Sequence, residues 1–386
     1  MNICILSHRY PYEGSMVHVF VKKLVDEWAK MGHRCIVISP LSIIHVLAGK
    51  EKVAPRIQVY SIGDGKEVVV YRPRYFTIPK MKCLGISLNG YIYQRCIEEA
   101  IQNTGLKFDV IYCHFFGMGV IGWHYADTHN IPFFIASGES TIMGISKPCL
   151  AFSLDKFRNT LSGVIAVSTK NKEEAIKKRL ADESRIKVFP NGANLHIFKR
   201  LDKIECRKKL GFPLHQFIII CVGQFVERKG QKRILKALDI LNNKEMNTIF
   251  VGKGEDNFEH DSILFKGVVE NERLPEYLNA ADLFVLPTQN EGCCNAIIEA
   301  LACGLPVVSS DKSFNYDVLN SNNSILVDPD NIQEIALAID SIFKNKDKRE
   351  LMAQKAFEKG QSLSIDKRAE RIMQFMQQKI DEGGQR

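Results

Sequence analysis

The alternation of short apolar runs with amphipathic stretches constrains the fold of this chain more than any other feature of its sequence. The pattern runs through the first half and restarts after about residue 200. Near-continuous apolar strands that alternate with helices are typical of a parallel sheet with helices on both faces. The expected strands are 2–7, 35–39, 109–113, 132–136, 163–167, 217–222, 248–251, 283–287 and 306–309, and the expected helices are 17–31, 231–241, 272–279, 295–302, 332–343 and 365–381.

The length of 386 residues and the restart of the pattern predict two α/β domains. We expect a Rossmann-like, doubly wound domain over residues 1–200 and a second over 201–364, joined near residues 200–205. A last helix, within 365–386, is expected to return to the first domain. Ligands of such sheets bind at the carboxyl ends of the strands. Two domains that face each other would therefore form a deep ligand-binding cleft.

The pattern of cysteines, and the lack of an apolar segment long enough to span a membrane, both indicate the cellular compartment. The eleven cysteines are scattered, with no C-x-x-C pair and no Cys/His spacing of the zinc type. They are expected to be buried free thiols, which suits a reducing cytosol. The first residues lack the features of a signal peptide, and no apolar stretch approaches the roughly 18 residues that span a bilayer. We therefore expect a cytoplasmic protein.

Positive charge is concentrated in the first half of the chain. Residues 1–200 hold 27 Lys and Arg against 16 Asp and Glu, whereas the remainder holds 25 against 28. The excess suits an anionic partner such as a phosphate, a phospholipid surface or nucleic acid, or it is a solvated face without a partner.

The segment Tyr71–Tyr93 interleaves basic and apolar side chains. They are Arg72, Arg74, Lys80 and Lys82 with Tyr75, Phe76, Ile78, Met81 and Leu84. The mixture suits a membrane interface or a lipid-phosphate acceptor, single-stranded nucleic acid, or a simple cover over the first sheet.

The strongest local signal lies in residues 286–310. Glu291 falls in a loop after an expected strand, and Glu299 falls inside the following helix. Ionised carboxylates accept hydrogen bonds from paired hydroxyls, which sugars and riboses supply. The N–H groups of Cys294, Asn295 and Ala296 begin the helix and could bind an anion. In the alternative interpretation, Glu291 caps the loop and Glu299 is a surface residue.

The segment EGCCNAIIEALACGLPVV resembles the E-x7-E signature of retaining glycosyltransferases of family 4, the group 1 glycosyltransferases with the GT-B fold. Further segments resemble this family in the same order over most of residues 1–330. These are SHRYPYEGSMVHVFVKKLVDEWAKMGHRCIVISP, FDVIYCHFFGMG, IPFFIASGES, VFPNGANLHIF, VGQFVERKG and FVGKGEDNF. The resemblance implies two Rossmann-like domains, a nucleotide-sugar donor and a hexosyl transfer with retention.

The resemblance implies roles for individual residues. Glu299 would bind the ribose hydroxyls, Glu291 the donor hexose and Lys229 the diphosphate, while the adjacent Arg228 would point elsewhere. The other donor-site residues would be Gly223, Gln224, Val268, Cys294, Asn295 and Ala296. In the first domain Gly14, His114 and Gly138 would border the acceptor or the phosphates. No metal or other cofactor is implied.

Three positions depart from the family pattern. Gln224 stands where an arginine is frequent, Ser137-Gly138 where a His-Gly pair is frequent, and Ala193-Asn194 where an aspartate is usual. Ser137 is therefore taken as a catalytic candidate beside Glu291 and Lys229. Glu139 and His114 are the alternatives to Ser137.

The leading hypothesis is a retaining hexosyltransferase that uses a UDP-sugar, with a GDP-sugar as the alternative. The expected acceptor is a lipid-linked or polysaccharide glycan of surface glycan biosynthesis. The expected location is the cytoplasm, with peripheral association at the inner face of the plasma membrane through the basic first domain, and nucleic acid is not expected as a partner. The rival hypotheses are a catalytically silent GT-B protein that binds a glycan or a partner enzyme, and a nucleotide-sugar epimerase.

Overall fold

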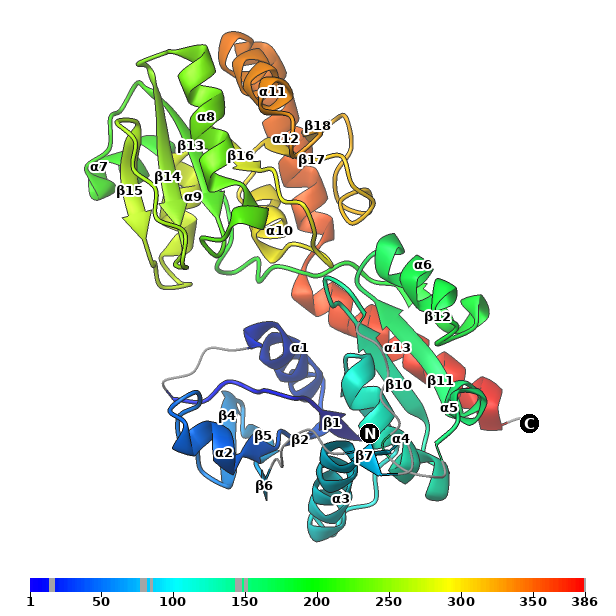
Figure 1. Cartoon of the computed structure of the whole chain (residues 1–386). Coiled ribbons are helices and arrows are strands. Elements are labelled where there is room, and N and C mark those ends of the chain that lie inside the picture. The colour runs from blue at the N-terminus through cyan, green and yellow to red at the C-terminus, as the bar shows by residue number, and fades with distance from the viewer. Residues whose placement is uncertain (14–17, 77–81, 84–85, 143–147, 149–151, 385–386) are drawn as a thin grey trace. The chain divides into compact units, whose positions relative to one another are not determined.

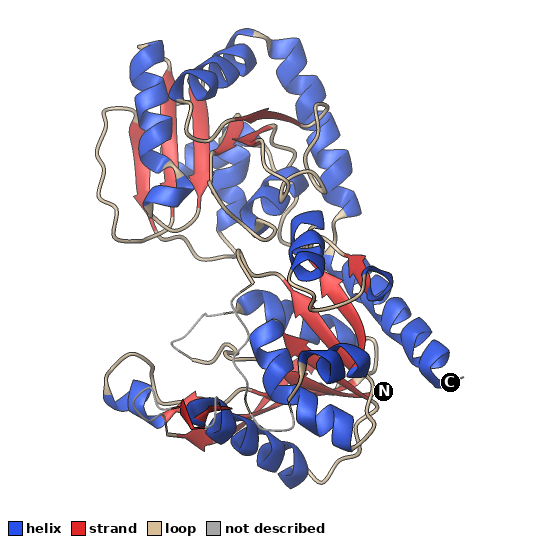
Figure 2. Cartoon of the chain, turned by 45° about the vertical axis from the view of Figure 1, so that its right-hand side comes forward, coloured by secondary structure: helices blue, strands red, loops and turns tan. Residues whose placement is uncertain are grey.

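The computed structural model describes residues 1–13, 18–76, 82–83, 86–142, 148 and 152–384, and the chain forms two compact units (Figure 1). The first unit consists of Met1–Phe189 and Ala369–Arg386, and the second of Pro190–Arg368. The chain thus leaves the first unit before the predicted boundary at residue 200 and returns to it after the predicted one at residue 364. Figure 2 shows the strands of each unit lying among helices.

The first unit is built on an eight-stranded sheet with the order β12-β11-β10-β9-β1-β2-β5-β4. Every neighbouring pair is parallel except β4 and β5. The strands are β1 (Asn2–Leu6), β2 (Arg34–Ile38), β4 (Ile57–Gly63), β5 (Lys66–Tyr71), β9 (Val110–His114), β10 (Phe133–Ser137), β11 (Leu161–Ala166) and β12 (Ile186–Val188). The helices are α1 (Val19–Lys30), α2 (Ile43–Leu47), α3 (Leu88–Asn103), α4 (Phe116–Thr128), α5 (Leu154–Thr160) and α6 (Thr169–Lys177), with a 3₁₀ turn, η1 (Glu183–Arg185). Two small ladders pair β3 (Leu41–Ser42) with β6 (Arg74–Tyr75) and β7 (Lys82–Cys83) with β8 (Ile86–Ser87).

The last helix, α13 (Ile365–Gly384), supplies part of the core of the first unit. Its Phe375 ring lies 6.3 Å from that of Phe134 and 5.7 Å from that of Phe189, measured between centroids. The buried Trp28 of α1 donates a hydrogen bond of 3.2 Å from its indole nitrogen to the carbonyl oxygen of Ala369. The C-terminal helix therefore packs back onto the first unit, as predicted.

The second unit holds a six-stranded, wholly parallel sheet with the order β15-β14-β13-β16-β17-β18. The strands are β13 (Phe217–Val222), β14 (Met246–Val251), β15 (Ile263–Gly267), β16 (Leu283–Leu286), β17 (Val307–Ser310) and β18 (Ser324–Val327). The helices are α7 (Lys203–Leu210), α8 (Gln231–Leu241), α9 (Leu274–Ala280), α10 (Asn295–Ala302), α11 (Ile332–Lys344) and α12 (Lys346–Ser362). The chain order of the strands reverses between β13 and β16, which is the point where open α/β sheets place their ligands.

Two glycines let the loops after β13 and β14 touch backbone to backbone. A Cβ on Gly252 would lie 1.9 Å from the carbonyl oxygen of Gly223, and one on Gly254 would lie 2.1 Å from that of Phe225. No side chain fits at these distances, so glycine is required at both positions. The close contact fixes the path of the loop that follows β13.

All cysteines that the structure describes in detail are free thiols, and most of them are buried. In the part of the chain that the structure describes, no helix is long and apolar enough to cross a bilayer.

Candidate active site

The candidate active site of the second unit lies where β13 and β16 end. After β13 the chain forms the short 3₁₀ helix η2 (Glu227–Lys229), and after β16 it forms the loop that carries Glu291. The ammonium nitrogen of Lys229 lies 2.6 Å from Oε1 of Glu291. Their side chains are only 10% and 12% exposed. The structure thus brings together two of the predicted catalytic residues in a buried ion pair.

Arg228 belongs to the same cluster, and the prediction that it points elsewhere was wrong. Its guanidinium nitrogen Nη1 lies 2.9 Å from Oε1 of Glu291 and donates a hydrogen bond of 2.6 Å to the carbonyl oxygen of Asn290. The hydroxyl of Thr288 donates a further hydrogen bond of 3.0 Å to Oε1 of Glu291. The tight turn of η2 directs both of its cationic side chains to one carboxylate, which the spacing of the sequence did not indicate.

The environment keeps both partners of the ion pair charged. Burial alone would raise the pKa of Glu291, but the positive charge and hydrogen bond of Lys229, with Arg228 and Thr288, lower it below its ordinary value. Burial alone would lower the pKa of Lys229, but the neighbouring Cys294 and Glu291 raise it above its ordinary value. The carboxylate and the ammonium group are therefore both ionised across the neutral range.

We expect the stabilisation from Glu291 to depend on pH in the acid range. Because the pKa of the folded protein is depressed, the contribution is complete above the unfolded value of about 4.5 and is lost as the pH falls through the folded value. Urea unfolding should show wild type more stable than Glu291→Gln at pH 7, with the difference shrinking below about pH 4.5. A difference that stayed constant down to pH 3 would contradict this assignment.

Two other predicted donor-site residues, Gly223 and Cys294, lie beside the ion pair. A Cβ on Gly223 would lie 3.5 Å from Cε of Lys229, so the lysine side chain runs along this glycine. Cys294 is buried and precedes the first turn of α10, where Asn295 is exposed and Ala296 half-buried. The thiol of Cys294 interacts electrostatically with Lys229.

The three remaining predicted donor-site residues differ in how far their side chains are exposed to solvent. Glu299 is only 9% exposed, so it is not the surface residue of the alternative interpretation. Val268, after β15, is 66% exposed. Gln224 is also exposed, and its carbonyl oxygen accepts a 2.9 Å hydrogen bond from the side chain of Gln231.

In the first unit, the half-buried carboxylate of Glu139 holds the strand end that carries Ser137 and Gly138. Oε2 of Glu139 accepts hydrogen bonds from the Ser137 hydroxyl at 3.2 Å and the Gly138 N–H at 3.0 Å. Its Oε1 accepts a bond of 2.9 Å from the N–H of Phe116, the first residue of α4. Burial raises the pKa of Glu139. Glu139 thus caps a helix N-terminus, a role that sequence spacing did not reveal because the two segments are distant in sequence.

His114 ends β9 and lies in an aromatic cluster. Its ring centroid lies 5.7 Å from that of Phe20 and 5.5 Å from that of Phe115. Phe115 has φ 75° and ψ 154°, a backbone conformation that costs free energy outside glycine and is frequent at functional sites. Gly14 lies outside the described residues, and so do Ile78, Lys80, Met81 and Leu84 of the basic and aromatic segment.

Comparison with known proteins agrees with this fold. The family model for glycosyl transferases group 1 matches residues 202–359, and that for glycosyltransferase family 4 matches residues 17–196. The chain is 30% identical to TuaC of Bacillus subtilis (strain 168), a glycosyltransferase provisionally assigned to teichuronic acid biosynthesis, over 85% of this chain and 84% of that one. It is 26% identical to an Escherichia coli UDP-Gal:alpha-D-GlcNAc-diphosphoundecaprenol alpha-1,3-galactosyltransferase, over 62% of this chain and 67% of that one.

Solved structures show the same architecture. Sucrose-phosphate synthase from Thermosynechococcus elongatus has a TM-score of 0.74 at 20% identity, with 98% of each chain covered. The Anabaena protein Alr3699/HepE, in complex with UDP and glucose, has a TM-score of 0.69 at 16% identity, over 98% of this chain and 100% of that one. Fold and strand-end site define a glycosyltransferase of the GT-B type. The chain belongs to the group 1 glycosyltransferases, family 4, as its sequence motifs predicted.

Proposed function

We propose that this glycosyltransferase transfers a hexose, with retention, from a UDP-sugar to a lipid-linked or polysaccharide acceptor of surface glycan biosynthesis. The observation that carries the proposal is the buried Lys229–Glu291 pair at the reversal point of the second sheet. Relatives in teichuronic acid biosynthesis and in transfer to a diphosphoundecaprenol-linked sugar support the acceptor class. A neighbour that holds UDP and glucose supports the donor class.

The chemistry follows from the charges at the site. As the bond between the sugar and the diphosphate breaks, negative charge grows on the leaving oxygen and the anomeric carbon becomes oxocarbenium-like. Lys229, with Arg228 beside it, stabilises the departing diphosphate. Glu291 orients these cations and accepts hydrogen bonds from the donor hexose. A retaining transfer on the leaving-group face needs no nucleophile from the protein.

Glu299 is proposed to bind the ribose of the donor. It lies inside α10, and its side chain is largely shielded from water. A carboxylate in such a place can accept both ribose hydroxyls at once. We expect Glu299→Ala to weaken UDP binding about tenfold or more, because a charge-assisted pair of hydrogen bonds is lost. Calorimetric titration with UDP checks this, and Glu245→Ala, an exposed residue at the amino end of β14, is the matched control.

The donor class is tested by incubating the purified protein with UDP- and GDP-sugars and measuring nucleotide-dependent thermal stabilisation. We expect stabilisation by UDP-sugars, and no response to any nucleotide would contradict the proposal. A second arm follows the donor alone by NMR. Conversion of the sugar without an acceptor would favour an epimerase, and nucleotide binding without transfer to any acceptor would favour a silent binding protein.

A further inference from the structure

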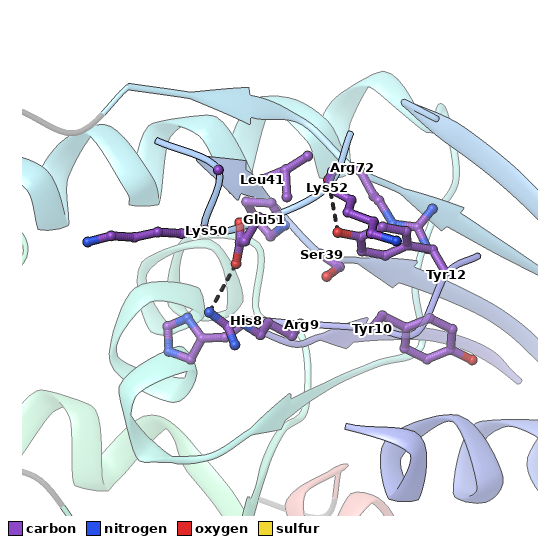
Figure 3. Close-up of a pocket in the computed structure, with 12 residues that line it drawn as sticks. His8, Arg9, Tyr10, Tyr12, Ser39, Leu41, Lys50, Glu51, Lys52 and Arg72 are labelled. Atoms are coloured by element: carbon purple, nitrogen blue, oxygen red, sulfur yellow. Dashed lines mark hydrogen bonds and ion pairs between the residues drawn. The ribbon is translucent and has the colours of Figure 1, made fainter. Parts of the chain in front are cut away.

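A pocket lies at the strand ends of the first unit. It has a volume of about 300 Å³ and is lined by the segments that follow β1, β2 and β5, with the 49–52 loop as its other wall (Figure 3). The charged residues that line it are Arg9, Lys50, Glu51, Lys52 and Arg72. This volume is at the lower end of the range of small-ligand sites.

Arg72 is a buried cation whose hydrogen-bond partners, in the described part of the chain, are all neutral. It is 1% exposed. Its terminal nitrogens donate to the Gln58 side-chain oxygen at 2.9 Å, the Pro11 carbonyl oxygen at 3.1 Å and the Tyr60 hydroxyl at 3.2 Å. Its buried Nε makes no hydrogen bond with any described residue. Buried charges in proteins are normally paired, so this guanidinium indicates an anionic ligand.

The rim of the pocket adds further positive charge. Arg9, Lys50 and Lys52 line it, and among the described residues its only acidic lining residue is Glu51. Glu51 pairs with Arg9 at 3.1 Å, a contact that Figure 3 marks with a dashed line. Together with Arg72, the described lining thus holds four cationic side chains and one carboxylate. The excess of positive charge in one concave site attracts anions and retains them.

A larger groove adjoins this pocket and shares Arg72 with it. Its volume is about 780 Å³, and it is lined by Arg56–Ile57, by Tyr71–Phe76 and by one side of α3. Phe76 is 58% exposed and Tyr91 is 45% exposed. Arg72 therefore lines both a cationic pocket and a groove with exposed aromatic side chains. A diphosphate attached to a hydrocarbon chain has this combination of charge and apolar surface.

We propose that the pocket around Arg72 binds the phosphoryl groups of a lipid diphosphate that carries the acceptor glycan, and that the lipid chain lies along the adjoining groove. Arg72 is the buried anchor of the anion, and Arg9 and Lys52 hold it from the rim. The proposal rests on the proposed transferase function for the identity of the acceptor. Binding of an anion to this pocket can be measured without any transfer reaction.

The test is calorimetric titration of the full chain with inorganic pyrophosphate, in the presence of saturating UDP to occupy the second unit. The double variant Arg9→Ala/Lys52→Ala should bind pyrophosphate about tenfold more weakly than wild type or worse. The matched control is Arg34→Ala/Lys107→Ala, which removes the same charge at the opposite, amino ends of strands in the same sheet. Equal binding by the two double variants would overturn the proposal. Arg72→Lys, which keeps the charge, distinguishes anion binding from loss of the fold.

Two further titrations identify the source of the anion. A C15 prenyl diphosphate should bind more tightly than pyrophosphate, and Phe76→Ser/Tyr91→Ser should remove only that difference. Glucuronate, whose negative charge is on a carboxylate and not on a phosphoryl group, should bind more weakly than pyrophosphate. A prenyl diphosphate that bound no better than pyrophosphate would overturn the lipid part of the proposal, and glucuronate that bound as well would overturn the phosphoryl part. Absence of UDP binding would count against the proposed function alone, because the pyrophosphate comparison does not depend on it.

Discussion

Lys229→Met should lower the rate of sugar transfer by about 10²–10³-fold, the effect of removing one preorganised charge from a developing anion. Lys229 follows the central strand β13, and its ammonium group is held in place by the contact with Glu291 at 2.6 Å. Because methionine has a similar shape without the charge, the packing beside Gly223 is kept. The measurement is kcat with a saturating UDP-sugar, together with the affinity for UDP.

Lys232→Met is the matched control for this substitution. Lys232 lies in the following helix, 51% exposed, and pairs with Asp256 at 2.9 Å. Its loss should leave transfer nearly unchanged.

Lys229→Met also leaves the buried Glu291 with fewer positive neighbours, so stability must be measured separately. In Lys229→Met/Glu291→Gln the buried charge is removed, which should restore stability without restoring transfer. Transfer at the wild-type rate by Lys229→Met would exclude the proposed role.

Phe375→Ala should destabilise the first unit by about 3–5 kcal/mol, the usual cost of deleting a buried aromatic ring. Phe375 belongs to the C-terminal helix but is 5% exposed within the core of the first unit, between Phe134 and Phe189. The chain has two tryptophans, Trp28 and Trp123, and both are buried in this unit. Tryptophan fluorescence during urea unfolding therefore reports on the first unit without a signal from the second.

The neighbouring Gln374 offers the control for this experiment, because it is exposed on the same helix. Gln374→Ala should leave the fluorescence transition within about 0.5 kcal/mol of wild type. An unchanged transition in Phe375→Ala would mean that α13 contributes little to the core of this unit.

Apolar runs in the sequence predicted most strands of the two main sheets. Strands of a parallel sheet are buried on both faces, so they are apolar along most of their length. The predicted bounds of β13, α8 and α10 agree with the structure. Helix α4 was missed because it is apolar on nearly every side and shows no helical period. Strand β4 was missed for another reason: it is an edge strand whose residues are exposed or half-buried throughout.

The candidate site could be predicted only where its residues belong to short motifs that are continuous in the sequence. Family resemblance singled out Lys229 and Glu291, and the structure brings them into contact. The direction of Arg228 depends on a three-residue turn that the sequence does not specify. Arg72 was interpreted as part of a basic surface segment, but tertiary packing buries it below Pro11 and Tyr60. Such a contact joins residues that lie far apart in the chain, so no local pattern reveals it.

The return of the C-terminal helix to the first unit has a consequence for protein synthesis. Domains usually fold as they leave the ribosome, the N-terminal one first. Here the second unit is one continuous segment, Pro190–Arg368, whereas the first lacks part of its core until Ala369–Arg386 has been translated. The order of completion is therefore reversed. Until that segment has been translated, apolar side chains around Phe134 and Phe189 stay uncovered in the nascent chain, where chaperones that bind exposed apolar segments would act.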